Sequence, residues 1–94
     1  MITAYDRKLL GDAIANILNV IFAEYFLSER HDYSMSVEYE KHSVSNSATI
    51  EKIRLNNLKE DSVIWEADFT KCQCINEFTA KIQDFEDFCV YYTA

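Results

Sequence analysis

The chain has 94 residues, of which 49% are hydrophobic and 14% aromatic, so it suits one domain over residues 1–94 and is too apolar for disorder. One glycine and no proline exclude the glycine-rich loops that bind phosphates. Sixteen acids against nine bases give a net charge of −7, which repels nucleic acids and anionic membranes and attracts basic surfaces.

The N-terminal region and the cysteines favour the cytoplasm. Asp6, Arg7 and Lys8 precede the first apolar run, which is unlike a secretory signal peptide. No unbroken apolar stretch approaches the roughly 18 residues that a membrane span needs. The cysteine count is odd, and Cys72 and Cys74 are too close in sequence for an ordinary disulfide. We therefore expect a cytoplasmic protein with reduced thiols and no membrane contact.

A long helix is predicted from Thr3 to about Ser28. Thr3 and Asp6 have the spacing of a capping box at its start. The expected buried stripe has helical spacing and consists of Leu10, Ile14, Ile17, Ile21 and Tyr25.

The second half of this helix is apolar nearly all round. The residues beyond the stripe are Val20, Phe22, Phe26 and Leu27. Either the sheet wraps around this end of the helix or another chain covers it, so these four are candidate contacts for a homodimer or a partner.

Three strands are predicted next. Tyr33, Met35, Val37 and Tyr39 alternate along the first strand, which runs from Tyr33 to Lys41, and residues 42–47 form a polar turn. Residues 48–58 fit a short helix or a strand, and a strand is preferred because turn residues follow it. The third strand runs from Ser62 to Thr70 or as far as Cys74, and its apolar series is Val63, Trp65, Ala67 and Phe69.

A last helix, capped by Asn76, is predicted from the spacing of Phe78, Ile82, Phe85, Cys89 and Tyr92. Its end, residues 88–93, has high β-propensity, so a terminal strand is the alternative. The expected fold is α+β, a single small domain of order α-β-β-β-α with a three-stranded antiparallel sheet and both helices packed on one face. The aromatic residues of the stripes are expected in the core.

Carboxylates occupy the polar side of two strands and carry the functional hypothesis. Glu38 and Glu40 alternate on the first strand, and Glu66 and Asp68 on the third. In one sheet they would form a solvent-facing acidic patch, with Asp84, Glu86 and Asp87 at its rim. The alternative is an ordinary wet sheet face whose acids are partly paired by Lys41, Lys52 and Arg54.

No set of residues indicates an enzyme, a metal site or a cofactor site. Cys72, Cys74 and Cys89 with His31 or His42 lack the spacing of a structural zinc site. Neither histidine has the context of a catalytic cysteine–histidine pair. Glu66 and Asp68 would need a cleft to act as a hydrolytic or magnesium-binding pair, and the chain is short for one. We expect a protein-binding function without catalysis.

In size, charge and architecture, though not residue for residue, the chain resembles the small acidic inhibitors of phages and mobile elements, such as anti-CRISPR proteins and DNA mimics. The resemblance implies an inhibitor that covers the basic surface of a nucleic-acid-binding protein or nuclease and does not bind nucleic acid itself. Toxin-immunity proteins share this profile. A homodimeric adaptor that uses the apolar end of the first helix is the alternative from another class.

Overall fold

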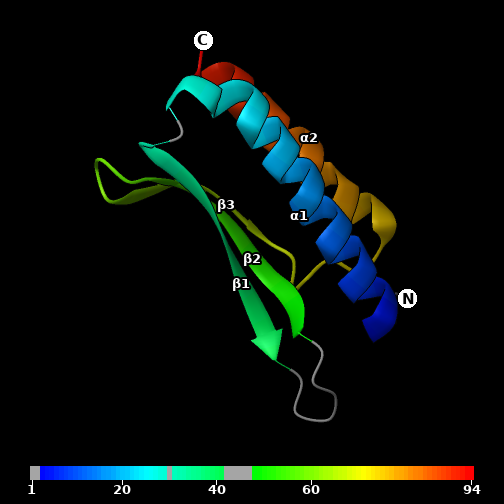
Figure 1. Cartoon of the computed structure of the whole chain (residues 1–94). Coiled ribbons are helices and arrows are strands. Elements are labelled where there is room, and N and C mark those ends of the chain that lie inside the picture. The colour runs from blue at the N-terminus through cyan, green and yellow to red at the C-terminus, as the bar shows by residue number, and fades with distance from the viewer. Residues whose placement is uncertain (1–2, 30, 42–47) are drawn as a thin grey trace.

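Two helices pack side by side on one face of a three-stranded antiparallel sheet (Figure 1). The computed structural model describes residues 3–29, 31–41 and 48–94. The elements follow in the order α1 (Ala4–Phe26), a short 3₁₀ turn (Leu27–Glu29), β1 (Tyr33–Lys41), β2 (Ala48–Asn57), β3 (Ser62–Asp68) and α2 (Ile75–Tyr92). This confirms the predicted α+β class, the α-β-β-β-α order and the strand at 48–58. The polar turn predicted at 42–47 lies outside the described residues.

Helix α1 extends along most of the 41 Å long axis of the molecule. Its start is capped as predicted, because the backbone N–H of Asp6 donates to Oγ1 of Thr3 at 3.1 Å. The single glycine, Gly11, faces β2, and a Cβ placed there would lie 3.3 Å from Cβ of Ile50. The absent side chain therefore lets this helix approach the central strand closely.

The two helices run in the same direction. Near their N-terminal ends, the guanidinium of Arg7 on α1 lies 5.4 Å from the ring centre of Phe78 on α2. Near their C-terminal ends, the ring centres of Phe26 and Tyr92 are 6.2 Å apart. Figure 1 shows both helices ending at the same end of the molecule as the β2–β3 hairpin. This arrangement matters for charge, because parallel helix dipoles add.

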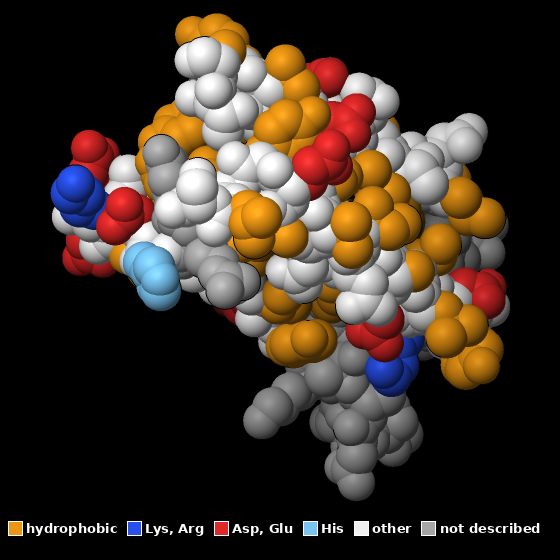
Figure 2. Space-filling view, turned by 45° about the horizontal axis from the view of Figure 1, so that its top comes forward, with side chains coloured by type: hydrophobic (Ala, Val, Ile, Leu, Met, Phe, Trp, Pro, Cys, Tyr) orange, Lys and Arg blue, Asp and Glu red, His pale blue; other side chains and the backbone are white. Residues whose placement is uncertain are grey.

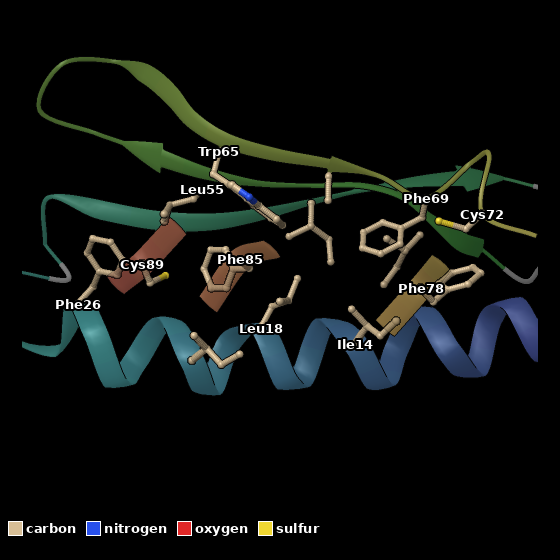
Figure 3. Packing of buried hydrophobic residues seen from close by; sticks show 14 residues of the cluster. Ile14, Leu18, Phe26, Leu55, Trp65, Phe69, Cys72, Phe78, Phe85 and Cys89 are labelled. Atoms are coloured by element: carbon tan, nitrogen blue, oxygen red, sulfur yellow. The ribbon is translucent and has the colours of Figure 1, made fainter. Parts of the chain in front are cut away.

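The core lies between the sheet and α1, and α2 contributes side chains from the flank (Figure 3). Leu18 of α1, Leu55 of β2 and Phe85 of α2 are fully buried. The other labelled members are Ile14, Phe26, Trp65, Phe69, Cys72, Phe78 and Cys89. Ile17, predicted in the buried stripe, is 42% exposed, because the face that packs on the sheet is centred on Leu18.

Two register shifts modify the predicted strand faces. The shift between Glu38 and Tyr39 comes near the end of β1, an edge strand, and Tyr39 is 51% exposed, so its placement in the core is wrong. The shift between Leu55 and Asn56 pairs Val63 with Asn56, and Val63 is 53% exposed. Trp65, Ala67 and Phe69 are buried as predicted. A bulge of this kind interrupts strict alternation along a strand.

The β3–α2 connection differs from the prediction at both of its ends. Strand β3 ends at Asp68, whose Oδ1 accepts a hydrogen bond from the backbone N–H of Thr70 at 2.9 Å, which turns the chain. Helix α2 begins at Ile75 with Cys74 in the N-cap position, so Asn76 is not the cap. The helix continues to Tyr92, and the alternative of a terminal strand is wrong.

Candidate protein-binding surfaces

On the outer face of the sheet, ion pairs between neighbouring strands neutralise part of the predicted acidic patch. Arg54 on the central strand lies opposite Ser36 of β1 and Glu66 of β3, and Glu38 is its diagonal neighbour on β1. Its Nη1 donates to Oε2 of Glu38 at 2.7 Å, and its Nε donates to Oε2 of Glu66 at 2.6 Å. The hydrogen bonds to Glu66 and then to Glu38 raise the pKa of Arg54. Two of the four predicted acids are therefore paired, as the alternative of a partly neutralised face expected.

Asp68 lies in the next row of the same face. The strand register places Lys52 between Asp68 and Glu38. Oδ1 of Asp68 accepts from Oγ1 of Thr70 at 2.5 Å and from its backbone N–H at 2.9 Å. These two bonds, the side-chain bond first, lower the pKa of Asp68. The carboxylate is thus used to shape the turn after β3.

Glu40 is exposed near the end of β1, opposite Thr49. It continues the outward series that contains Glu38, and no basic group among the described side chains lies within 4.0 Å of it. The side chain of Lys41, a predicted partner of these acids, lies outside the described set. The four strand acids therefore share one face, but they share it with Lys52 and Arg54.

The three acids predicted at the rim point in different directions from α2. Oδ2 of Asp84 accepts from the indole Nε1 of Trp65 at 3.1 Å, on the side of β3. Glu86 lies on the opposite side of the helix, near Tyr25 of α1, whose pKa is raised by burial and then by the charge of Glu86. Asp87 is exposed and accepts from Nε2 of Gln83 at 2.8 Å. Asp84 and Glu86 therefore lie on opposite sides of α2, and the three acids do not lie together along the sheet.

Glu86 and Asp87 instead belong to a concentration of acids at one end of the molecule. The C-terminal ends of both helices, residues 31–32 and the β2–β3 turn lie toward this end, where the hairpin projects away from the helices (Figure 1). Leu58 of that turn donates its backbone N–H to the carbonyl of Asp32 at 2.7 Å. We call this region the acidic end; its described acidic residues are Glu24, Asp32, Glu60, Asp61, Glu86 and Asp87.

Among the described side chains, few positive groups balance the acidic end. Lys59 is the basic residue of its turn, and at the left of Figure 2 a single basic side chain sits among acidic ones, beside a histidine. Neither α1 nor α2, both inside the described ranges, has a basic residue in its last turn. The negative ends of two parallel helix dipoles therefore add to the field of the carboxylates.

The opposite end of the helix layer is electrically balanced. Its charged residues lie in the first turns of α1 and α2 and in the connection before α2. The acids of these segments are Asp6, Asp12 and Glu77, and the bases are Arg7, Lys8, Lys71 and Lys81. Both helix N-termini, the positive ends of the dipoles, also lie there. The molecule is thus electrically polarised along its long axis.

The four apolar contact candidates of the first helix divide into two groups. Phe26 is 1% exposed, and half-buried Phe22 stacks on it with 5.4 Å between ring centres, so both pack in the fold and are not free contacts. Val20 and Leu27 are 68% and 63% exposed. Sequence reasoning did not separate the two groups, because both faces of the helix are apolar.

The cysteines do not assemble a site. Cys72 and Cys89 are buried near opposite ends of α2, and Cys74 is exposed. Burial and then the charge of Glu86 raise the pKa of Cys89 to about 11, and burial raises that of Cys72. Within residues 3–29, 31–41 and 48–94 no three potential metal ligands come together, and His42 is outside these ranges.

Two open hollows lie along α2. One of about 490 Å³ contains Asp68 and Asp84 together with Lys71 and Lys81, so its charge is mixed. The other, of about 660 Å³, lies between the first turns of α1 and residues 73–76. Neither contains an array of groups that converges on a reacting atom.

Comparison of the chain with protein-family models, with curated proteins and with solved structures finds no match.

Proposed function

We propose that the protein is a non-catalytic inhibitor that binds the basic surface of a nucleic-acid-handling protein, with the acidic end as its principal contact. The observation that carries the proposal is that the segments with Glu24, Asp32, Glu60 and Asp87 and both helix C-termini lie toward one end of a polarised molecule. A concentrated negative field of this kind steers association with a cationic partner.

The outer face of the sheet is the secondary contact in this proposal. Glu40 and Asp68 extend outward acidity along the sheet, but Arg54 is already bonded to Glu38 and Glu66. A paired carboxylate gains less from a second cation than an unpaired one does. We therefore assign the sheet a smaller share of the binding free energy than the acidic end.

We propose an inhibitor because such a surface would compete with nucleic acid for the basic residues of the partner. A nucleic-acid-binding protein presents lysines and arginines at positions that contact phosphates. Carboxylates at the acidic end would bind these lysines and arginines in place of the phosphates and would make no nucleobase contacts. The proposed setting is a phage or mobile-element protein that blocks a bacterial defence complex. A toxin-immunity protein that covers a nuclease is the second setting of the same mechanism.

Two matched neutralised variants test the proposal. The end variant carries Glu24→Gln, Asp32→Asn, Glu60→Gln and Asp87→Asn, and the sheet variant carries Glu38→Gln, Glu40→Gln, Glu66→Gln and Asp68→Asn. Each removes four negative charges from the net charge of −7 and leaves −3. A difference in binding between the two variants therefore depends on where the removed charges lie and not on how many are removed.

The immobilised wild type is incubated with nuclease-treated bacterial lysate, and captured proteins are eluted with competing duplex DNA. We expect the wild type to capture nucleic-acid-binding proteins, and we expect duplex DNA to displace them. The end variant should capture none of them and the sheet variant a part of them, and binding should weaken steeply as salt is added. Capture that DNA does not displace, or equal capture by the end variant and the wild type, would contradict the proposal.

A further inference from the structure

Helix α1 has a second apolar stripe, on the face turned away from the sheet. The residues of this outer stripe are Leu9, Ala13, Asn16, Val20 and Ala23 of α1 and Leu27 at the start of the 3₁₀ turn, and all six are exposed. Leu9, Val20 and Leu27 are 50%, 68% and 63% exposed. In Figure 2, hydrophobic side chains lie on the surface of the helix layer with polar ones between them.

The outer stripe has the spacing of a coiled-coil seam. Its positions advance by four, three, four, three and four residues, which keeps them along one line of a helix that packs on another helix. The inner stripe of Ile14, Leu18 and Ile21 is buried against the sheet. Two opposite apolar faces explain why Tyr5–Phe26, among the described residues, has a mean hydropathy of 1.4 and enough length to cross a membrane, although no unbroken apolar run does.

We propose that the outer stripe is the interface of an antiparallel homodimer, with Asn16 on the two-fold axis. In such a pair, residues equally distant from Asn16 face each other. Leu9 then lies opposite Ala23 of the second copy, and Tyr5 lies opposite Leu27. By the same rule Val20 lies opposite Asp12 and next to Ala13, so a large side chain meets a small one at the Leu9–Ala23 contacts on either side of the axis.

Asn16 supplies the register. It is the one polar member of the outer stripe and stands at its centre. A single asparagine in an apolar seam specifies alignment at some cost in stability, and two asparagine amides across a two-fold axis can each donate to and accept from the other. An antiparallel alignment centred on another residue of the stripe would separate the two Asn16 amides and remove this pair of hydrogen bonds.

Charge selects the antiparallel orientation. A parallel dimer would bring two acidic ends together, with four helix dipoles pointing the same way. The antiparallel dimer places each acidic end beside the balanced end of the other copy, where Lys8 and the two helix N-termini lie. The dipoles of the two copies then oppose each other favourably.

The size of the seam indicates a weak dimer. Helix α1 has 23 residues and is about 35 Å long, so the seam is one helix wide and about 35 Å long. This contact lies at the small end of specific interfaces, which bury about 800 Å² per partner. A dissociation constant in the micromolar range is therefore expected, and added salt should strengthen the dimer because both copies carry −7.

Sedimentation equilibrium of the full chain from about 1 µM to about 1 mM tests the dimer. The apparent mass should rise from 11.0 kDa toward twice that value. Val20→Lys should remain a monomer throughout. Val63→Lys, the same substitution at a 53% exposed residue of β3, should dimerise as the wild type does. Circular dichroism confirms that both variants are folded.

Cysteine cross-linking in a Cys74→Ser background tests the orientation. A mixture of the Leu9→Cys and Ala23→Cys proteins should form a mixed disulfide, and Ala23→Cys alone should not cross-link with itself. Self-cross-linking of Ala23→Cys as fast as in the mixture would overturn the antiparallel arrangement.

The same measurements separate a dimer from other occupants of the outer stripe. A wild type that stays monomeric at every concentration, or a Val20→Lys protein that dimerises like the wild type, would overturn the proposal. A monomer that co-sediments with phosphatidylcholine vesicles would assign the stripe to a lipid surface instead. The outer stripe does not include the four residues changed in the end variant, so this variant should still dimerise, and a failed capture experiment would leave the dimer proposal standing.

Discussion

The indole Nε1 of Trp65 donates a hydrogen bond to Oδ2 of Asp84 at 3.1 Å and joins strand β3 to helix α2. Trp65 is 8% exposed, and its ring lies 4.7 Å from that of Phe85, centre to centre. The carboxylate predicted as part of an acidic rim therefore serves the packing of two layers. Its contribution to the fold has to be separated from any contribution to binding.

Replacement of Asp84 should measure this contribution. We expect Asp84→Ala to lower the free energy of unfolding by about 1–2 kcal/mol, because it leaves a buried indole N–H without an acceptor. Asp84→Asn keeps an acceptor oxygen and should cost less. Urea unfolding followed by the fluorescence of the single tryptophan reports both values. Equal losses for Ala and Asn would show that the hydrogen bond does not contribute.

Arg7 should be the most sensitive charged residue of the described first helix. Its Nη1 donates to the carbonyl of Phe69 at 2.9 Å, its Nη2 donates to the carbonyl of Cys72 at 2.5 Å, and its guanidinium faces the ring of Phe78. Arg7→Met removes both donors and leaves the two part-buried carbonyls without them, so we expect a loss of about 2–3 kcal/mol.

Lys8→Met is the matched control for Arg7→Met. Lys8 forms an exposed i,i+4 pair with Asp12 at 3.0 Å, a type of pair that contributes about 0.3–0.5 kcal/mol. Denaturant unfolding of the two variants under the same conditions compares them. Similar losses would show that the connection before α2 does not depend on Arg7.

The pH dependence of stability should contain a contribution from Asp68. Bonds from Thr70 lower the pKa of this carboxyl in the folded protein below its unfolded value, which is about 3.9. The stabilisation is therefore present above about pH 4 and is lost as the pH falls through the folded pKa. Asp68→Asn should be less stable than the wild type at about pH 7, and the difference should shrink by about pH 3.

Thr70→Val provides the check on the Asp68 prediction. It removes the hydroxyl donor, which is the largest cause of the lowered pKa. The acid-induced loss of stability should become smaller in this variant than in the wild type. Acid titrations followed by tryptophan fluorescence measure it. If the loss of stability at acidic pH is the same in Thr70→Val and in the wild type, the Asp68–Thr70 bond does not stabilise the folded state.

The three thiols should react at different rates. Cys74 is exposed, whereas Cys72 and Cys89 are 4% and 0% exposed and burial raises their pKa values. Since the thiolate is the reactive form, one equivalent of iodoacetamide should label the native protein at about pH 8, and all three thiols should react in urea. Mass spectrometry locates the label, and Cys74→Ser should abolish fast labelling.

Patterns that involve one element at a time were predictable. Alternation along Trp65, Ala67 and Phe69, and the helical spacing of Phe78, Phe85 and Cys89, depend on which side of one strand or helix is apolar. The wrong burial predictions concern residues whose environment depends on a neighbouring strand or helix. A register shift in the pairing of β2 with β3 exposes Val63, and two apolar faces on one helix left Ile17 and Leu18 indistinguishable as core residues.

The element order, the excess of acids and their outward alternation on two strands follow from local spacing and composition, so they can be predicted from the amino-acid sequence. Which acids are paired depends on contacts between strands and helices that form only on folding. The strand pairing brought Arg54 within hydrogen-bond distance of Glu38 and Glu66, and the parallel course of the helices brought Glu24 and Asp87 to one end. Electrostatic fields depend on distances between groups far apart in the chain, and folding alone sets those distances.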